Sequence, residues 1–176
     1  MDFGFTKEQE NLRKEVLEFI RVNMTPAVYA EMDAAEEATE STSQERHPGK
    51  RGPLLQAVFD KIGERGWLGY SYPKEYGGQD GDRVGQNIIE EEFLRAGIQV
   101  SLVGSGAPAI MAVGTEEQKR YFLPKLIKME YSFALGFTEP HAGADLAALK
   151  CRAKRDGDHF VINGQKMYTT SAHFAT

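Results

Sequence analysis

The sequence predicts an α+β protein, in which an all-α N-terminal helical domain over residues 1–130 precedes the first strands of an antiparallel β domain over residues 131–176. Three observations predict this. Apolar residues recur at helical spacing up to residue 130, and the period changes to two after Tyr131. Turn signals then follow at 156–158 (Asp-Gly-Asp) and 163–164 (Asn-Gly). Because a small sheet with open edges is only marginally stable, we expect more protein to follow.

The composition is that of an ordinary globular protein and argues against several classes. At 176 residues and 41% hydrophobic, the chain can bury a sizeable core. Its net charge of −5 argues against general nucleic-acid binding, and no apolar run has the length of a membrane span. The N-terminus lacks the features of a signal peptide, and the one cysteine, Cys151, cannot form an internal disulfide. We therefore expect a cytoplasmic protein with no nucleic-acid or membrane partner. The four histidines have no paired spacing and no cysteine partner, so no metal site is expected.

The first helices are predicted from their ends and their apolar faces. Thr6 and Gln9 form a capping-box pattern that begins the first helix. Pro53 suits the first position of a later helix, since proline lacks the N–H that would be unpaired there. The predicted elements are a helix over residues 7–24, a helical continuation to about residue 40, a mobile loop to residue 52 and a helix over residues 53–66.

The middle of the helical domain combines an aromatic connection with two further helices. Residues 67–78, rich in aromatics and glycine, are expected to form a loop packed onto the core. Asp82 can cap a helix to about residue 96, with Val84, Ile88, Ile89 and Phe93 inward. The glutamates at 90–92 then lie mostly on the outer face, which argues against a catalytic cluster.

Small residues dominate the stretch 100–113, which predicts a helix packed closely by its neighbours, with Pro108 near its first turn. Its Gly-Ser-Gly run is not a dinucleotide-binding fingerprint, because no strand precedes it. Thr115 and Gln118 form a second capping-box pattern, and Pro124 should kink or divide the helix that it opens.

Four strands are expected, over residues 132–138, 150–155, 159–162 and 165–171. The first ends at Pro140 and leads into a loop with Gly143, which permits close approach of the backbone, and Asp145, a candidate cap. Such a loop can present N–H groups to a flat or anionic ligand. The alternative is an ordinary exit from strand to turn.

The last predicted strand has a second feature that suits a planar ligand. A period of two places Lys166, Tyr168 and Thr170 on one face, so an aromatic ring lies two residues from a hydroxyl. This pair could form a wall for a heterocycle that accepts hydrogen bonds. The alternative is a Tyr–Thr pair on the surface of a sheet.

Together these segments resemble the acyl-CoA dehydrogenase family. The resemblance is carried by residues 138–146 (T-E-P-x-A-G-x-D-L) and 163–170 (N-G-Q-K-x-Y-x-T), at matching separation. Further similarity at residues 73–78, 114–119 and 122–126 extends it over nearly the whole chain. It implies an acyl-CoA dehydrogenase-like fold with FAD as the cofactor. The residues that it assigns to FAD are Leu135, Gly136, Phe137, Thr138, Ala144, Tyr168, Thr169 and Thr170.

Two of these positions depart from the family pattern. Ala144 replaces the usual serine, which contacts both the FAD pyrophosphate and the CoA thioester arm. Ala144 is thus assigned to cofactor and substrate, and it keeps the backbone donor while losing a hydrogen bond that contributes about 1 kcal/mol. Tyr168 replaces the usual tryptophan beside the isoalloxazine and keeps an aromatic face. Thr138 and Thr170 retain their hydroxyls, and the resemblance places the latter at flavin N5.

The resemblance implies α,β-dehydrogenation of an acyl-CoA thioester to a 2-enoyl-CoA. The family's catalytic carboxylate belongs to a C-terminal domain, so no catalytic residue is assigned here, Glu139 is expected to be structural, and the chain alone should be inactive. The implied partners are an acyl-CoA substrate, an electron-transfer flavoprotein and further copies of the chain in a homotetramer or homodimer. Small residues at 104–112 suggest a roomy pocket for a branched or cyclic acyl group. The alternatives are an acyl-CoA oxidase on the same fold and a helical dimerisation or scaffold module without flavin.

Overall fold

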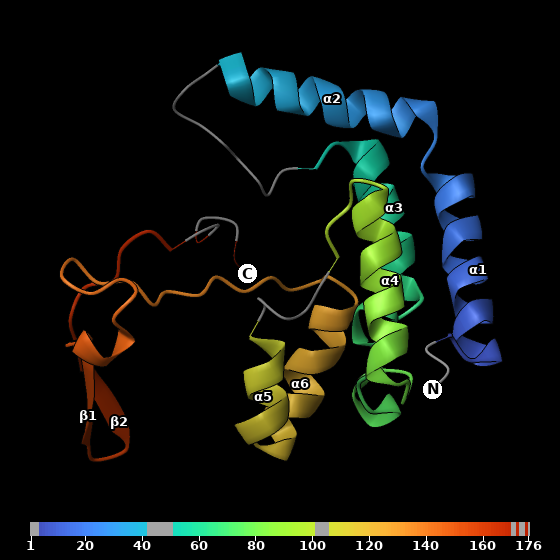
Figure 1. Ribbon diagram of the computed structural model, residues 1–176. Helices are drawn as coiled ribbons and strands as arrows, with labels where there is room; N and C mark the ends of the chain where they lie inside the picture. The colour runs from blue at the N-terminus through green and yellow to red at the C-terminus, as the bar shows by residue number, and fades with distance from the viewer. Residues whose placement is uncertain (1–3, 42–50, 101–105, 170–171, 173–174, 176) are drawn as a thin grey trace. The chain divides into compact units, whose positions relative to one another are not determined.

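The structure is a computed structural model that describes residues 4–41, 51–100, 106–169, 172 and 175. It divides into two compact units, Met1–Ser132 and Phe133–Thr176. In the described residues the first unit is helical and the second contains a single hairpin, as Figure 1 shows. The predicted α+β class, with helices before strands, is confirmed.

The first unit opens with α1 (Lys7–Asn23) and α2 (Pro26–Ser41). The predicted capping box is present, because Gln9 N donates to Thr6 Oγ1 and Thr6 N donates to Gln9 Oε1. The predicted helical continuation to about residue 40 is also confirmed. The loop predicted to follow lies mostly outside the described residues.

The next helix, α3 (Pro53–Glu64), begins at Pro53 as predicted. Its first turn is also held from a distance, by Glu31 of α2. The two carboxylate oxygens of Glu31 accept hydrogen bonds from Leu54 N at 3.2 Å and Leu55 N at 2.8 Å. A side chain more than twenty residues earlier thus supplies the N-terminal cap that Gly52 lacks.

The core of this unit forms where α4 (Arg83–Arg95) packs beside α1 (Figure 1). Asp82 caps α4 as predicted, and Ile88, Ile89 and Phe93 are buried. Val84 was predicted to face inward and is instead 45% exposed. In this first turn the buried positions are Gly85 and Gln86, so the core-facing side of the helix begins one residue later than the pattern indicated.

The three glutamates of α4 do not form a cluster. Glu91 is exposed, Glu90 is half-buried, and Glu92 is buried between two arginines. Glu92 Oε1 lies 2.7 Å from Arg13 Nε and 2.6 Å from Arg95 Nη1. The carboxylate is therefore occupied by two ion pairs, of which the pair with Arg13 joins α4 to α1 and the pair with Arg95 lies within α4.

The aromatic connection packs onto the core as expected and contains two short 3-10 turns, η1 (Trp67–Gly69) and η2 (Lys74–Tyr76). The ring of Trp67 meets that of Phe19 edge to face at 5.0 Å. Phe93 lies 5.8 Å from Phe19 and 5.7 Å from Trp67, measured between ring centroids. Rings contributed by α1, η1 and α4 thus form one aromatic cluster.

The unit ends with α5 (Ala107–Val113) and α6 (Glu116–Ile127), which pack against each other. The prediction of a closely packed small-residue helix is wrong for the described part. Ala109 and Ala112 are exposed, and Val113 is 86% exposed, because this short helix turns only one side toward α6. The second capping box is present. Pro124 lies inside a continuous α6, so it does not divide the helix.

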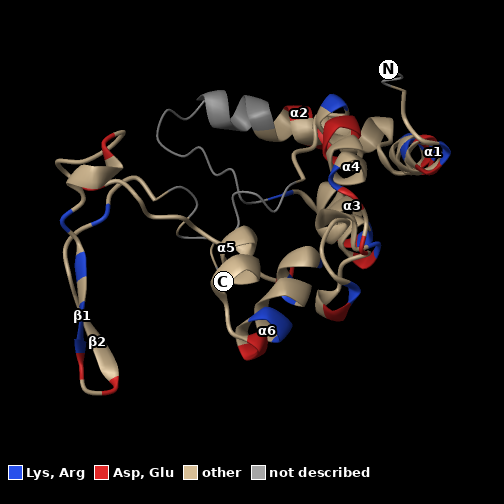
Figure 2. Ribbon diagram, turned by 60° about the horizontal axis from the view of Figure 1, so that its bottom comes forward, with Lys and Arg blue, Asp and Glu red and all other residues tan. Residues whose placement is uncertain are grey.

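The second unit contains η3 (Leu146–Ala148) and one antiparallel hairpin of β1 (Arg152–Asp156) and β2 (His159–Asn163), with Arg152 opposite Asn163. The predicted turn at 156–158 is confirmed, with Gly157 at φ 63°. The basic residues of β1 are visible along the strand in Figure 2. Every residue of both strands is exposed within the described chain.

Two of the four predicted strands do not form over the described residues. Residues 133–138 and 165–169 form no ladder, and the backbone bond that joins them runs from Met167 N to Thr138 O at 2.8 Å. Tyr168 has φ 54°, which turns the chain out of the extended conformation. The Asn-Gly pair at 163–164 therefore does not open a second hairpin, and the predicted alternation through Lys166 and Tyr168 is wrong.

Candidate functional site

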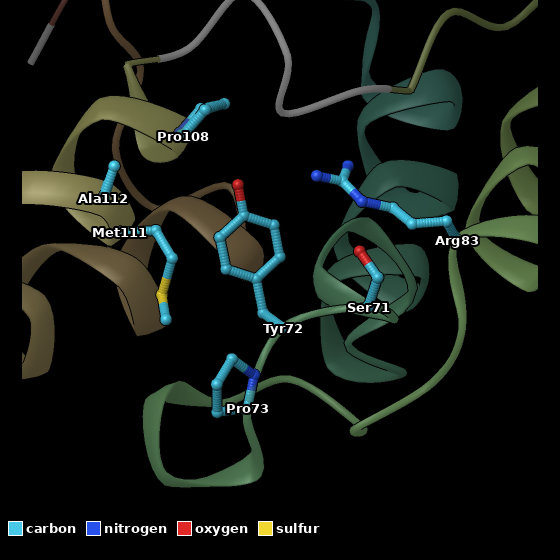
Figure 3. Close-up of a pocket in the computed structure, with 7 residues that line it drawn as sticks. All are labelled: Ser71, Tyr72, Pro73, Arg83, Pro108, Met111 and Ala112. Carbon is cyan, nitrogen blue, oxygen red and sulfur yellow. The ribbon is translucent and has the colours of Figure 1, made fainter.

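A pocket of about 440 Å³ lies in the first unit, against the connection that follows η1, the start of α4, and α5. Figure 3 shows its lining, in which the Tyr72 hydroxyl and the Arg83 guanidinium are both turned into the hollow. Burial raises the pKa of Tyr72, and the charge of Arg83 opposes this shift. The pocket thus combines apolar walls with a phenol, a cation and the hydroxyl of Ser71. Its lining residues are Ser71, Tyr72, Pro73, Arg83, Pro108, Met111 and Ala112.

The small residues at 104–112 predicted a roomy pocket beside them. Of these, Ala112 lines the pocket together with Pro108, but Ala109 does not. The roles of Tyr72 and Arg83 were missed. The aromatic connection was read only as packing, and nothing in its pattern separates the rings that enter the core from the one that lines a pocket.

A second site is built around Glu139 in the second unit. Its carboxylate is almost fully buried, with 2% of the side chain exposed. Oε2 accepts a hydrogen bond from Lys150 N at 2.7 Å, and Oε1 accepts from Cys151 N at 2.9 Å and from Lys166 Nζ at 2.9 Å. His141 Nε2 lies 3.4 Å from Oε2.

These donors determine the ionisation of the carboxyl group. The hydrogen bond from Lys150 N, followed by that from Lys166, lowers the pKa of Glu139 to about 2. Glu139 is therefore ionised at neutral pH, with its oxygens occupied by donors, and cannot serve as a general base there. This agrees with the structural role expected from the sequence.

The residues predicted to face a flavin lie around the ion pair that Lys166 Nζ forms with Glu139 Oε1. Leu135, Gly136 and Phe137 are exposed, and Thr138 is half-buried. Among the described residues, the backbone N–H groups of 135–138 have no hydrogen-bond partner. A Cβ added at Gly136 would come within 3.0 Å of Thr169 Oγ1, so these two residues are close neighbours.

The other predicted positions are less enclosed. Ala144 is exposed, and a Cβ added at Gly143 would meet nothing within 4 Å, so this loop has room beside it. Tyr168 is 81% exposed. Asp145 begins η3 without a side-chain capping bond, so its predicted role as a cap is wrong. Thr170 lies outside the described residues.

Over the part of the chain that the structure describes, no group of three or more His, Cys, Asp or Glu side chains could hold a metal ion. Within the same residues, no helix has both the length and the apolar character needed to cross a membrane.

Comparison with known proteins identifies two matching family models. Residues 6–130 match the model "Acyl-CoA dehydrogenase, N-terminal domain", and residues 134–176 match "Acyl-CoA dehydrogenase, middle domain". A curated relative, acyl-CoA dehydrogenase FadE26 of Mycobacterium tuberculosis, is 39% identical over 99% of this chain and 42% of its own length.

Solved structures agree with these matches. The ChsE4-ChsE5 complex from Mycobacterium tuberculosis contains a chain that is 38% identical with a TM-score of 0.75, covering 99% of this chain and 42% of that one. The Tcur3481-Tcur3483 steroid ACAD gives 37% identity and a TM-score of 0.74, covering 99% and 43%. The chain thus spans less than half the length of these relatives, and over that span it belongs to the acyl-CoA dehydrogenase family.

Proposed function

We propose that this chain supplies the N-terminal portion of an enzyme that oxidises an acyl-CoA thioester to a 2-enoyl-CoA with FAD. In this proposal residues 1–130 form the helical domain and residues 131–176 begin the β domain. When bound, FAD takes up the hydride that leaves the β-carbon of the acyl group. The observation that carries the proposal is the row of N–H groups at 135–138 that have no partner among the described residues, in a chain that belongs to the acyl-CoA dehydrogenase family.

The residues present fit a flavin. The pyrimidine ring of a flavin has two carbonyl oxygens and a ring nitrogen as acceptors, and exposed backbone donors in an extended segment suit them. The side-chain hydroxyl of Thr138 makes no hydrogen bond to another described residue and can add a donor. Gly136 leaves open the space beside Thr169 that a side chain would fill. Leu135, Gly136, Phe137 and Thr138 would therefore hold the pyrimidine edge.

Four further residues complete the proposed site. Tyr168 would place its exposed ring beside the isoalloxazine, with Thr169 and Thr170 contributing hydroxyls near it. Ala144 would approach the pyrophosphate and the thioester arm of CoA through its backbone, and Gly143 leaves that approach open. The catalytic base would come from polypeptide outside these 176 residues, because the carboxylate in this motif, Glu139, is already occupied.

The pocket of the first unit supports a bulky acyl group as the substrate. A volume of about 440 Å³ exceeds the need of a short straight chain and suits a branched or cyclic group. One relative is described as a steroid ACAD, which supports the same class. Ala112→Leu, which fills the pocket, should lower kcat/KM for a cyclic acyl-CoA about tenfold while changing that for butyryl-CoA little. Ala109→Leu is the matched control, since Ala109 lies on α5 but outside the lining.

The proposed partners follow from the family. An electron-transfer flavoprotein would accept the electrons, and the whole enzyme would be a cytoplasmic oligomer. The expected form is a homotetramer or homodimer. The relative solved as the ChsE4-ChsE5 complex supports assembly of this kind of chain into an oligomer.

The test is the visible spectrum of the full-length protein that carries these residues. A flavin band that is lost on anaerobic addition of an acyl-CoA supports the proposal. Reoxidation by electron-transfer flavoprotein and not by air separates a dehydrogenase from an acyl-CoA oxidase. Absence of a flavin band, even after FAD is supplied, would favour the scaffold alternative.

A further inference from the structure

We propose that the ion pair between Lys166 and Glu139 is a positioning element that holds the segment 135–138 in the geometry needed to bind FAD. The inference rests on the proposed function, because it concerns the same site. Neither residue would touch the flavin; both would act through the backbone that does.

The segment that would face the flavin has little structure of its own. It is extended, largely exposed and not part of a ladder over the described residues. Such a segment loses conformational freedom when it binds a ligand, and that loss weakens binding unless the segment is already fixed. Something else in the unit must therefore hold it.

Lys166 provides this constraint. Its Nζ donates to the carbonyl of Phe137 at 3.0 Å and to Glu139 Oε1 at 2.9 Å. Directly beside it, Met167 N donates to Thr138 O at 2.8 Å. Two consecutive residues of the 165–169 segment thus hold two consecutive carbonyls of the 135–138 segment, and the N–H groups of that segment have no partner among the described residues.

Glu139 fixes the other end of the same connection. Its carboxylate is held by Lys150 N and Cys151 N, immediately before β1. Its backbone also forms a two-bond bridge with Ala142, through N to O at 2.8 Å and O to N at 3.1 Å. The ammonium of Lys166 is therefore anchored to a carboxylate that cannot move independently of the loop.

The charge of the pair matters as well as its hydrogen bonds. Only 2% of the Glu139 side chain and 31% of the Lys166 side chain are exposed. Removing Lys166 leaves this carboxylate with two backbone donors and His141, whose Nε2 lies 3.4 Å away. None of these three donates to the Phe137 carbonyl, so the link between the two flavin-facing segments would be reduced to the single bond from Met167.

The test compares Lys166→Met with wild type in the full-length holoenzyme, after FAD has been removed and added back. The variant should bind FAD about tenfold more weakly. This is less than the full contribution of a charge-assisted hydrogen bond, because Lys166 holds the FAD-binding segment and does not contact FAD itself. The visible circular dichroism of the flavin at saturating FAD should also change. Lys166→Arg, which keeps the charge, should recover most of the affinity. Lys154→Met is the matched control, since Lys154 is an exposed lysine of β1, and it should bind FAD as wild type does.

The inference is overturned if Lys166→Met keeps the FAD affinity and the flavin circular dichroism of the wild type. If its melting temperature is lowered at the same time, the ion pair has a role in stability alone. Lys166→Gln, which removes the charge but keeps a polar end group, replaces Lys166→Met if that chain does not fold. A wild-type protein that binds no FAD refutes the proposed function and the inference together, whereas wild-type binding with an unaffected variant refutes the inference alone.

Discussion

Phe93→Ala is predicted to be among the most destabilising single substitutions in the helical unit. Phe93 is fully buried and belongs to the aromatic cluster, with its ring 5.8 Å from that of Phe19 and 5.7 Å from that of Trp67. Truncation of a buried phenylalanine to alanine costs about 3–5 kcal/mol. Each aromatic pair contributes about 0.5–1.5 kcal/mol beyond the area it buries, so the loss should not fall at the low end of that range, and we expect about 4 kcal/mol.

The assay is urea unfolding followed by tryptophan fluorescence. The sequence has one tryptophan, and Trp67 is buried in this cluster, so its emission reports on this unit. With a denaturant slope of about 2 kcal/mol per molar urea, a loss of about 4 kcal/mol moves the midpoint down by about 2 M. The midpoint is the quantity to compare, because removing a neighbouring ring also changes the emission of the folded state.

The matched control is Leu94→Ala, one residue later in α4. Leu94 is 62% exposed, so its truncation should change the free energy of unfolding by no more than about 0.5 kcal/mol. Equal midpoints for Phe93→Ala and Leu94→Ala would refute the assignment of the core face of α4. A large loss of stability in Leu94→Ala, without one in Phe93→Ala, would mean that the opposite face of α4 packs against the core.

Three further predictions concern side chains that accept or donate hydrogen bonds. The pKa of Glu139 is lowered from its ordinary value of 4.5 to about 2. Its contribution to stability is therefore present above pH 4.5 and is lost as the pH falls through 2. In Glu139→Gln the free energy of unfolding should fall less steeply with decreasing pH over this range. The hydrogen bond from Tyr76 to Glu116 raises the pKa of Tyr76 from 10 to about 12. Its contribution to stability is therefore present below pH 10 and is lost as the pH rises through 12. Ultraviolet titration of tyrosinate should show one high-pKa group that is absent in Tyr76→Phe. Thr6→Ala removes the cap that accepts from Gln9 N and should cost about 1 kcal/mol in the same urea assay, whereas an unchanged midpoint would show that α1 does not depend on it.

The helices could be predicted from sequence because their signals are local. Both capping boxes join residues three positions apart, and the buried faces follow the helical period. The cap that Glu31 provides for α3 could not be predicted in this way. It joins residues 23 and 24 positions apart in the chain, so it exists only once α2 and α3 are placed side by side.

The β unit was predicted less well for the same reason. A two-residue period shows that a segment can be extended, but a strand forms only when a neighbour pairs with it. The hairpin at 152–163 carries its own partner, whereas segments 133–138 and 165–169 pair through a single backbone bond over the described residues. The positive φ of Tyr168 likewise has no local signal, since tyrosine rarely adopts it.

The candidate site was found mainly through its motifs, and the motifs did not reveal how it is held together. The motif predicted a structural role for Glu139 but did not indicate the partners of its carboxylate. Those partners lie 11, 12 and 27 positions away, and the lysine among them, Lys166, was read as one residue of a strand face. Contacts over such separations are set by the fold of the loop, which no periodicity encodes.

The most direct measurement of the central claim is the yield of product per flavin in the full-length protein. Under anaerobic conditions, an acyl-CoA is added in steps while the flavin absorbance and the CoA thioesters are both measured. The account predicts that the flavin band is lost as 2-enoyl-CoA appears, with one 2-enoyl-CoA formed per flavin reduced. A flavin that stays oxidised in excess acyl-CoA, or a protein that holds no flavin, would contradict it.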